Sequence, residues 1–281
     1  MTPSAAGLFL SHIKSPRIRR HFDRLVEETR GLLTWRWLYC PKRSALSPFR
    51  LGPNAIGRGM EPRATQMRKN GTLNGGFADV AFIPRALALG SEFVWVMEYD
   101  VDFSGRWDDF FRQFGDNRAD LLTTSLAPRA ECPDWYYWPS ARAPDGVSEE
   151  RMYRSFNPIL RISRRFARHY SRAFANADWR GHNEFTLPTI ALVDDFRVED
   201  IGGRGSLCPD PRKGRNYFNN PKNHLDLGPG TFLWRPSLKG YFHEAPDQFA
   251  SRDMLYHPVK ADVPDWEIVA LPRKRERLIS V

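Results

Sequence analysis

This chain of 281 residues contains few cysteines and no long apolar run. Its three cysteines, Cys40, Cys132 and Cys208, have no CxxC or other metal-ligand spacing, which is typical of free thiols in a reducing compartment. No stretch of about 18 apolar residues is present, so we predict no membrane-spanning helix. The apolar segment 5–13 is short and runs into basic residues, so we interpret it as a first strand rather than a signal peptide.

Several well-known catalytic signatures are also missing. The chain has no P-loop lysine motif, no GxGxxG fingerprint, no GxSxG elbow and no kinase signature set. Positive charge, by contrast, is in excess: the net charge is +9. An anionic partner is therefore expected, and nucleoside diphosphates, anionic lipid surfaces and nucleic acid all fit that charge.

Apolar runs and helix-like spacings alternate along the first half of the chain. Strands are expected at 7–12, 32–39, 93–103 and 120–126, and helices at 16–31, 78–89 and 107–114. This alternation predicts an α/β fold in which helices cover both faces of a mostly parallel sheet. The strands at 7–12 and 93–103 are expected to be close neighbours.

The second half is predicted to contain a polar, aromatic-rich loop over 128–150 and then an amphipathic helix. The apolar stripe of that helix is expected to run from Ile159 to Phe174. Its other face would be a solvated surface or one that faces phosphate or membrane, and it carries Arg161, Arg164, Arg165, Arg168 and Arg172. A helix over 184–193, a strand over 196–201 and a loop over 202–235 follow. With no repeat and no linker, we predict one domain over residues 1–281.

The most informative feature is the apolar run at 93–97, which ends in three acids, Glu98, Asp100 and Asp102. Buried carboxylates are costly unless they are paired or bound to metal, and ligands of open α/β sheets bind at the carboxyl ends of strands. On a regular strand, Asp100 and Asp102 point to one face and would suit Mg²⁺ or Mn²⁺. Glu98 shares that parity, so the pair could instead be Glu98 and Asp100.

Other candidate residues are spread along the chain. Glu184, at a predicted helix start, could be a general base or a dipole-stabilised acid, and His182 could orient it or contact phosphate. His257 is a candidate third metal ligand, although a structural histidine is equally plausible, and Lys260 could reach a phosphate. The remaining predicted donor contacts are His12 at the end of the first strand and the glycines of a possible phosphate-binding turn, Gly75 and Gly76.

In this order, the motifs resemble a glycosyltransferase of the GT-A type, whose fold is a Rossmann-like sheet covered by helices. The resemblance implies a nucleoside-diphosphate sugar donor and a Mn²⁺ or Mg²⁺ ion held by Asp100, Asp102 and His257. It divides the domain into a donor half, about 1–127, and an acceptor half, about 128–281. It implies Glu184 as the base of an inverting enzyme, with Glu98 and Tyr99 beside the donor. Acceptor sugars would stack or bond in a region that contains Trp135, Tyr136, Trp138 and His182.

Two alternatives remain open. A nucleotidyltransferase has a similar sheet with paired acids, but it usually has a Gly-rich loop after the first strand, where this chain has Ser15-Pro16-Arg17. A basic nucleic-acid-binding protein is compatible with the charge, but the acids at 98–102 would repel phosphates, so no nucleic-acid partner is expected. The acceptor is expected to be a glycan or lipid-linked. The protein is expected to be cytoplasmic, with peripheral contact at the inner membrane face as a further hypothesis.

Overall fold

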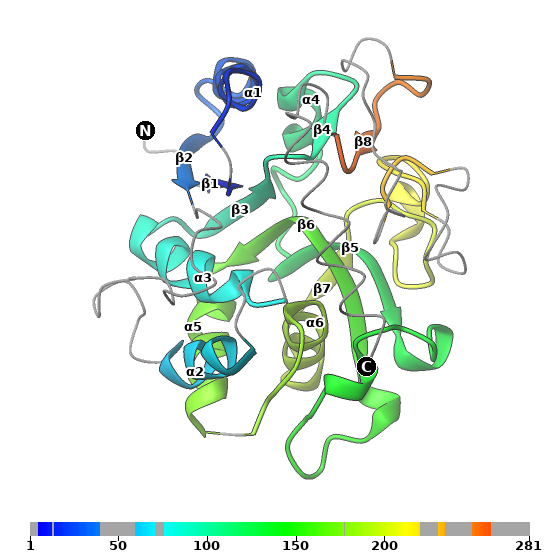
Figure 1. Ribbon diagram of the computed structural model, residues 1–281. Helices are drawn as coiled ribbons and strands as arrows, with labels where there is room; N and C mark the ends of the chain where they lie inside the picture. Colours follow the sequence, from blue (N-terminus) through cyan, green and yellow to red (C-terminus); the bar gives the residue numbers. More distant parts are fainter. Residues whose placement is uncertain are drawn as a thin grey trace.

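The computed structural model describes residues 5–12, 14–39, 60–70, 76–176, 178–219, 230–233 and 249–259. At its centre is a six-stranded sheet with the order β2-β1-β3-β6-β5-β7 (Figure 1). The strands of this sheet are β1 (Ala5–Ser11), β2 (Thr34–Tyr39), β3 (Phe93–Glu98), β5 (Leu121–Pro128), β6 (Tyr153–Ser163) and β7 (Val198–Asp200). Two short strands, β4 (Asp102–Phe103) and β8 (Leu255–Tyr256), pair separately in antiparallel fashion.

Five of the six strands run in one direction. Strand β1 is parallel to β2 and β3, β5 is parallel to β7, and β6 runs antiparallel to both of its neighbours, β3 and β5. The expected mostly parallel α/β sheet is therefore confirmed, as is the pairing of the first strand with the acid-bearing strand. Gly7 on β1 leaves room for the ring of Trp35 on the neighbouring strand β2. A Cβ at position 7 would lie 2.3 Å from that ring.

Helices cover both faces of the sheet (Figure 1). One hydrophobic core contains residues of α1 (Pro16–Glu28) and α4 (Trp107–Arg112). The core on the opposite face takes residues from α2 (Glu61–Asn70), α3 (Ala78–Leu89), α5 (Arg164–Asn176) and α6 (Asn183–Val193). Ser15 caps α1, because its side chain accepts a hydrogen bond from the Ile18 N–H group at 3.2 Å. Within the described ranges, no helix has the length and apolar character needed to cross a membrane.

The prediction of one helix with an apolar stripe from Ile159 to Phe174 is wrong in its first part. Residues 153–163 form the central strand β6, and α5 begins only at Arg164. Ile159, Leu160 and Ile162 are all buried because a central strand is covered on both faces, and such continuous burial cannot be separated from a helical stripe by periodicity alone. Arg161 is consequently not on a solvated face: it is buried and donates hydrogen bonds to the carbonyl oxygens of Phe114 and Asn117.

Two further differences concern the first half of the chain. The expected strand over 93–103 is interrupted: β3 ends at Glu98, a turn follows, and β4 starts at Asp102. The helix α2 was not anticipated, because no helix was expected between the strand at 32–39 and the helix at 78–89. Its sequence, EPRATQMRKN, has only a weak apolar stripe, so the helix depends on tertiary contacts rather than on periodicity.

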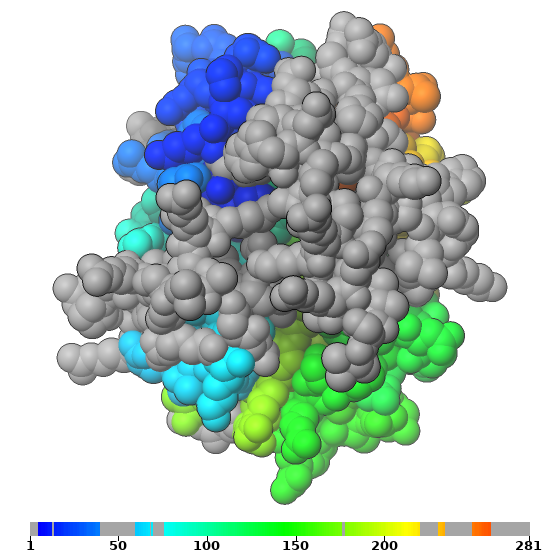
Figure 2. Space-filling view, in the orientation of Figure 1, coloured from blue at the N-terminus to red at the C-terminus, as the bar shows by residue number. Residues whose placement is uncertain are grey.

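The strongest of these contacts is a fully buried ion pair between α2 and α3. Arg63 Nε lies 2.7 Å from Asp79 Oδ2, and both side chains are 0% exposed. The same guanidinium donates to the carbonyl oxygens of Gly76 and Gly181, which precede α3 and α6. Figure 2 shows α2 next to the segment that leads into α6, on the same side of the molecule as part of the 128–150 region. Arg63 thus joins the N-terminal ends of two helices.

We predict that Asp79→Asn lowers the free energy of unfolding by about 3–5 kcal/mol, because it leaves the Arg63 guanidinium buried without its counter-ion. The matched control is Asp23→Asn, which removes an exposed i,i+4 pair with Arg19 and should change stability by less than about 0.5 kcal/mol. Urea denaturation of both variants checks this. Equal, small effects would contradict the central role of the buried pair.

Candidate metal site at the end of strand β3

The candidate site begins where the chain leaves the sheet. Glu98 is the last residue of β3 and pairs with Leu10 of β1. The Tyr99 N–H group donates to the Leu10 carbonyl oxygen at 2.8 Å, and the Val101 N–H group donates to the Glu98 carbonyl oxygen at 3.1 Å, which closes a turn. This turn places the Asp100 carboxylate beyond the end of the strand, at the edge of the sheet where ligands of open α/β proteins bind.

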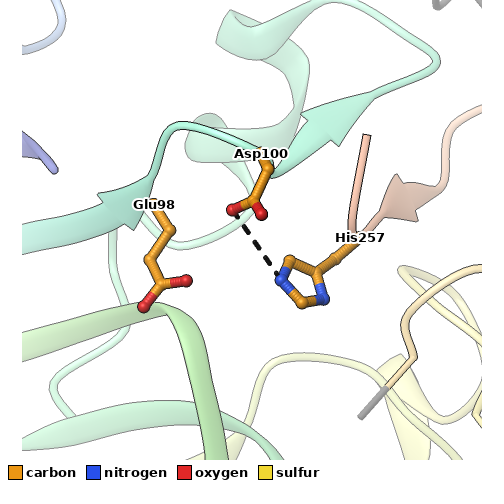
Figure 3. A group of neighbouring side chains, drawn as sticks. All are labelled: Glu98, Asp100 and His257. Atoms are coloured by element: carbon orange, nitrogen blue, oxygen red, sulfur yellow. Dashed lines mark ion pairs between the residues drawn. The ribbon is translucent and has the colours of Figure 1, made fainter. Parts of the chain in front are cut away.

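His257 joins these two acids from the other end of the chain. Potential ligand atoms of Glu98, Asp100 and His257 all lie within 4.8 Å of one another. Figure 3 shows the imidazole directed toward Asp100, with 3.8 Å between His257 Nε2 and Asp100 Oδ1. The backbone holds this arrangement, because β8 pairs with β4 and the Val259 N–H group donates to the Asp100 carbonyl oxygen at 2.8 Å. Two carboxylates and one imidazole are a donor set that divalent metals accept.

The hydrogen bond on the far side of the His257 ring decides which nitrogen is available. His257 Nδ1 lies 3.0 Å from the Leu233 carbonyl oxygen, which can only accept, so Nδ1 carries the hydrogen. Neutral imidazole then has its lone pair on Nε2, the atom that faces Asp100. A carbonyl that fixes the tautomer in this way is the usual outer-shell partner of a metal-binding histidine. Phe156 of β6 and Phe232 pack against the same ring, with centroids at 5.1 and 5.4 Å.

Asp102 does not join this cluster. Its Oδ1 accepts from Arg24 at 2.9 Å and from the Phe103 N–H group at 2.7 Å, and its side chain is buried. The same arginine donates to the carbonyl oxygens of Phe103 and Gly105. The expectation that Asp100 and Asp102 present one face fails because the strand ends before both residues. Of the two acid pairs that the sequence left open, the structure brings Glu98 and Asp100 together with His257.

His21, which the sequence reasoning did not single out, holds the segment that follows Asp100. His21 of α1 is buried, and its Nε2 donates to the Val101 carbonyl oxygen at 2.9 Å, while Nδ1 lies 3.6 Å from Asp102 Oδ2. Burial lowers the pKa of His21, and nearby Asp102 opposes this shift. Together with Arg24, His21 attaches α1 to the segment that follows Asp100, so the position of the acid cluster depends on α1.

Glu184 lies at the start of α6, as predicted. The helix is capped by His182, whose Nδ1 accepts from the Glu184 N–H group at 3.2 Å and lies 3.5 Å from Glu184 Oε2. His182 is stacked on Tyr137, with ring centroids 4.1 Å apart. Gly76 is required beside this ring, since a Cβ there would lie 2.0 Å from the imidazole and its φ is +91°.

The start of α6 and the acid cluster lie toward the same edge of the sheet. Strand β6 is antiparallel to β3, with Ile159 opposite Met97, so its earlier residues run past the end of β3. One of them, Ser155, has its Oγ 3.3 Å from the Glu184 carbonyl oxygen. Glu98 has the same parity as Val94 and Val96, which pack in the core that also contains α6, so Glu98 is on the α6 face of β3.

The predicted aromatic platform over 128–150 has a different role for most of its members. Trp135 and Trp138 are 1% and 5% exposed and belong to the hydrophobic core beneath α6. Trp138 also donates to the Cys132 carbonyl oxygen at 2.7 Å. Only Tyr136, at 43%, offers a substantially exposed ring. Buried rings cannot stack on a sugar, so Trp135 and Trp138 as acceptor contacts are corrected to packing residues.

Of the other residues predicted to contact the donor, the structure describes His12 and Gly76. His12 follows β1, and its ring lies edge-on to that of Tyr99 at 5.0 Å, so these two residues are neighbours beside the acid cluster. Gly76 lies at the start of α3, and the Asn183 N–H group donates to its carbonyl oxygen at 2.8 Å. Gly75 and Lys260 lie outside the described residues.

Asn157 of β6 was missed by the sequence reasoning. Hydroxyl groups of Thr123 and Ser155 lie 2.6 and 2.9 Å from its Oδ1. Its Nδ2 is shielded from solvent and has no hydrogen-bond partner in the described part of the chain. Whichever way the amide is turned, one of its polar ends is unsatisfied, which is uncommon for a buried group. The only sequence signal was a polar residue inside an apolar run, Phe156-Asn157-Pro158-Ile159.

Comparison of this chain with models of known protein families and with curated proteins finds no match. The chemistry of the site therefore rests on its own residues.

The cluster predicts opposite results for two identical substitutions. Asp100→Asn should weaken Mn²⁺ binding by more than about tenfold, because it removes a candidate ligand and outer-shell changes alone cost 10–100-fold. Asp102→Asn should leave the Mn²⁺ affinity nearly unchanged and instead lower the melting temperature, because it weakens the ion pair with Arg24. Calorimetric titration with Mn²⁺ and thermal melts of both variants test this. A loss of Mn²⁺ binding in Asp102→Asn alone would contradict the assignment.

Proposed function

We propose that this protein is a metal-dependent glycosyltransferase that moves a sugar from a nucleoside-diphosphate donor to a hydroxyl group. The observation that carries the proposal is the cluster of Glu98, Asp100 and His257 beyond the end of β3. Its position, at the carboxyl edge of a mostly parallel α/β sheet, is where such folds bind nucleotides.

The residues of the cluster fit a hard divalent cation such as Mn²⁺ or Mg²⁺. Glu98 and Asp100 supply carboxylate oxygens, and His257 supplies a nitrogen whose tautomer is set by the Leu233 carbonyl oxygen. When bound, the ion would neutralise the diphosphate and the charge that develops on it as the sugar departs. His12 and Tyr99, which adjoin the cluster, are our proposed neighbours of the donor.

Glu184 is the proposed general base. Its carboxylate is buried and lies beside His182, and α6 begins at the sheet edge that carries the cluster. Because His182 Nδ1 accepts the Glu184 N–H hydrogen bond, the imidazole is held with its other nitrogen protonated. Tyr137 and Gly76 fix the ring from two sides. In this geometry His182 holds the backbone of Glu184 at the start of α6, and the Glu184 carboxylate would remove the proton from the attacking hydroxyl group.

Nucleotide binding provides the first test. UDP or GDP should raise the melting temperature of the wild-type protein only when Mn²⁺ or Mg²⁺ is present. A ligand at about 100 times its Kd should stabilise the fold by about 2.7 kcal/mol. Asp100→Asn should abolish the metal-dependent shift, and Asp102→Asn, the matched control, should retain it. If neither nucleotide shifts the melt with either metal, the transferase proposal is wrong.

Turnover provides the second test. Glu184→Gln should lower the release of nucleoside diphosphate from a sugar donor by about 10²–10⁴-fold, because it removes the base while keeping the size of the side chain. Metal-dependent nucleotide binding should be unchanged. Glu150→Gln, the same substitution at an exposed residue of the 128–150 region, is the control and should keep full activity. Equal activity of the two variants would remove Glu184 from the mechanism.

A further inference from the structure

Arg154 of β6 has an environment unlike that of any charged residue discussed so far. Its side chain is 2% exposed and is among the largest fully buried side chains of the protein. Within the described part of the chain, no carboxylate lies within ion-pair distance of its guanidinium, and its Nε is shielded from solvent with no hydrogen-bond partner. An uncompensated buried charge costs several kcal/mol, so such a group requires an explanation.

Among the described residues two other arginines are buried, and they show what a structural guanidinium looks like in this fold. Arg63 is paired with Asp79 and also donates to the carbonyl oxygens of Gly76 and Gly181. Arg161 donates to the carbonyl oxygens of Phe114, Asn117 and Ala119. Both therefore have carbonyl or carboxylate acceptors for their charge, whereas Arg154 has none among the residues that the structure describes.

The nearest candidate partner of Arg154 is a thiol. Its guanidinium contacts the side chain of Cys132, but burial raises the pKa of that thiol, and the positive charge of Arg154 only partly opposes this shift. Cys132 Sγ also lies 3.2 Å from the Pro128 carbonyl oxygen, to which a protonated thiol can donate. Cys132 is thus a neutral neighbour and supplies no counter-charge.

Arg154 lies at the same edge of the sheet as the metal cluster. Arg154 and Phe156 pair with Ala127 and Thr124 of β5, with a register shift between the two pairs, and their Cα atoms are about 7 Å apart along β6. The ring of Phe156 packs on His257. The backbone of Arg154 is therefore two residues along β6 from the aromatic contact that supports the metal cluster.

We infer that Arg154 forms an oxyanion-binding subsite beside the cluster, in which its planar fork of donors pairs with a phosphoryl or carboxylate group of a substrate. An anion there would supply the counter-charge that the described protein lacks. This subsite goes beyond the proposed transferase activity, because it requires no metal and no nucleotide.

The test measures anion binding without metal. Wild type, Arg154→Met and Arg154→Lys would be melted in a chelator at constant ionic strength, with sodium pyrophosphate or sodium glucuronate added in steps. Arg168→Met, which removes the same charge from an exposed position of α5, is the control. Comparison of the two anions distinguishes a phosphoryl from a carboxylate ligand.

Wild type and Arg168→Met should show a saturable rise in melting temperature with at least one anion. Arg154→Met should lose that rise, and Arg154→Lys should keep only part of it, because lysine lacks the bidentate fork. Without anion, Arg154→Met should melt no lower than wild type, since it removes an unpaired buried charge. A lower melting temperature or failure to fold would show a structural arginine and overturn the inference, as would an unchanged anion response in Arg154→Met or none in wild type. A chelator abolishes any metal-dependent nucleotide binding, so this result is independent of the nucleotide test.

Discussion

The arrangement of this protein depends on the reversed direction of β6 between β3 and β5. Because β6 runs antiparallel to both neighbours, its first residues lie where β3 and β5 end. Phe156 is thereby placed against His257, and Ser155 reaches the first turn of α6. With β6 parallel, those residues would lie at the opposite edge of the sheet. The acid cluster, the start of α6 and the unpaired Arg154 share one edge for this reason.

A second constraint is the treatment of charge at that edge. Asp102 is held by Arg24 and attaches α1 to β4, whereas Asp79 is held by Arg63 and joins α3 to α2. Asp100 instead faces Nε2 of His257, the nitrogen that is free of hydrogen in the neutral tautomer set by the Leu233 carbonyl oxygen. Two acids only two residues apart therefore have different electrostatic environments, and the difference comes from α1 on one side and from the segment 254–259 on the other.

Buried ion pairs also explain how the helices are placed. Arg63 binds the carbonyl oxygens that precede α3 and α6, so the first turns of both helices depend on a single side chain of α2. Tyr170 donates to Asp79, the ion-pair partner of Arg63, at 2.7 Å. Burial raises the pKa of this phenol well above its ordinary value. The orientation of His182 and Glu184 is thus coupled to a polar network in the core below them.

The sequence alone determined the α/β class, the strand that delivers the acids, its pairing with the first strand and the helix that starts beside Glu184. These features are local: they follow from short apolar runs, from the Ser15-Pro16 cap and from the placement of acids after a buried strand. It also named Glu98, Asp100 and His257 as candidates. Only the tertiary structure decided which acids meet, because β3 ends at Glu98 and long-range contacts of Arg24 and Val259 set the course of the chain beyond it. Strand β6 was mistaken for a helix for the same reason, since burial on both faces depends on neighbours that periodicity does not reveal.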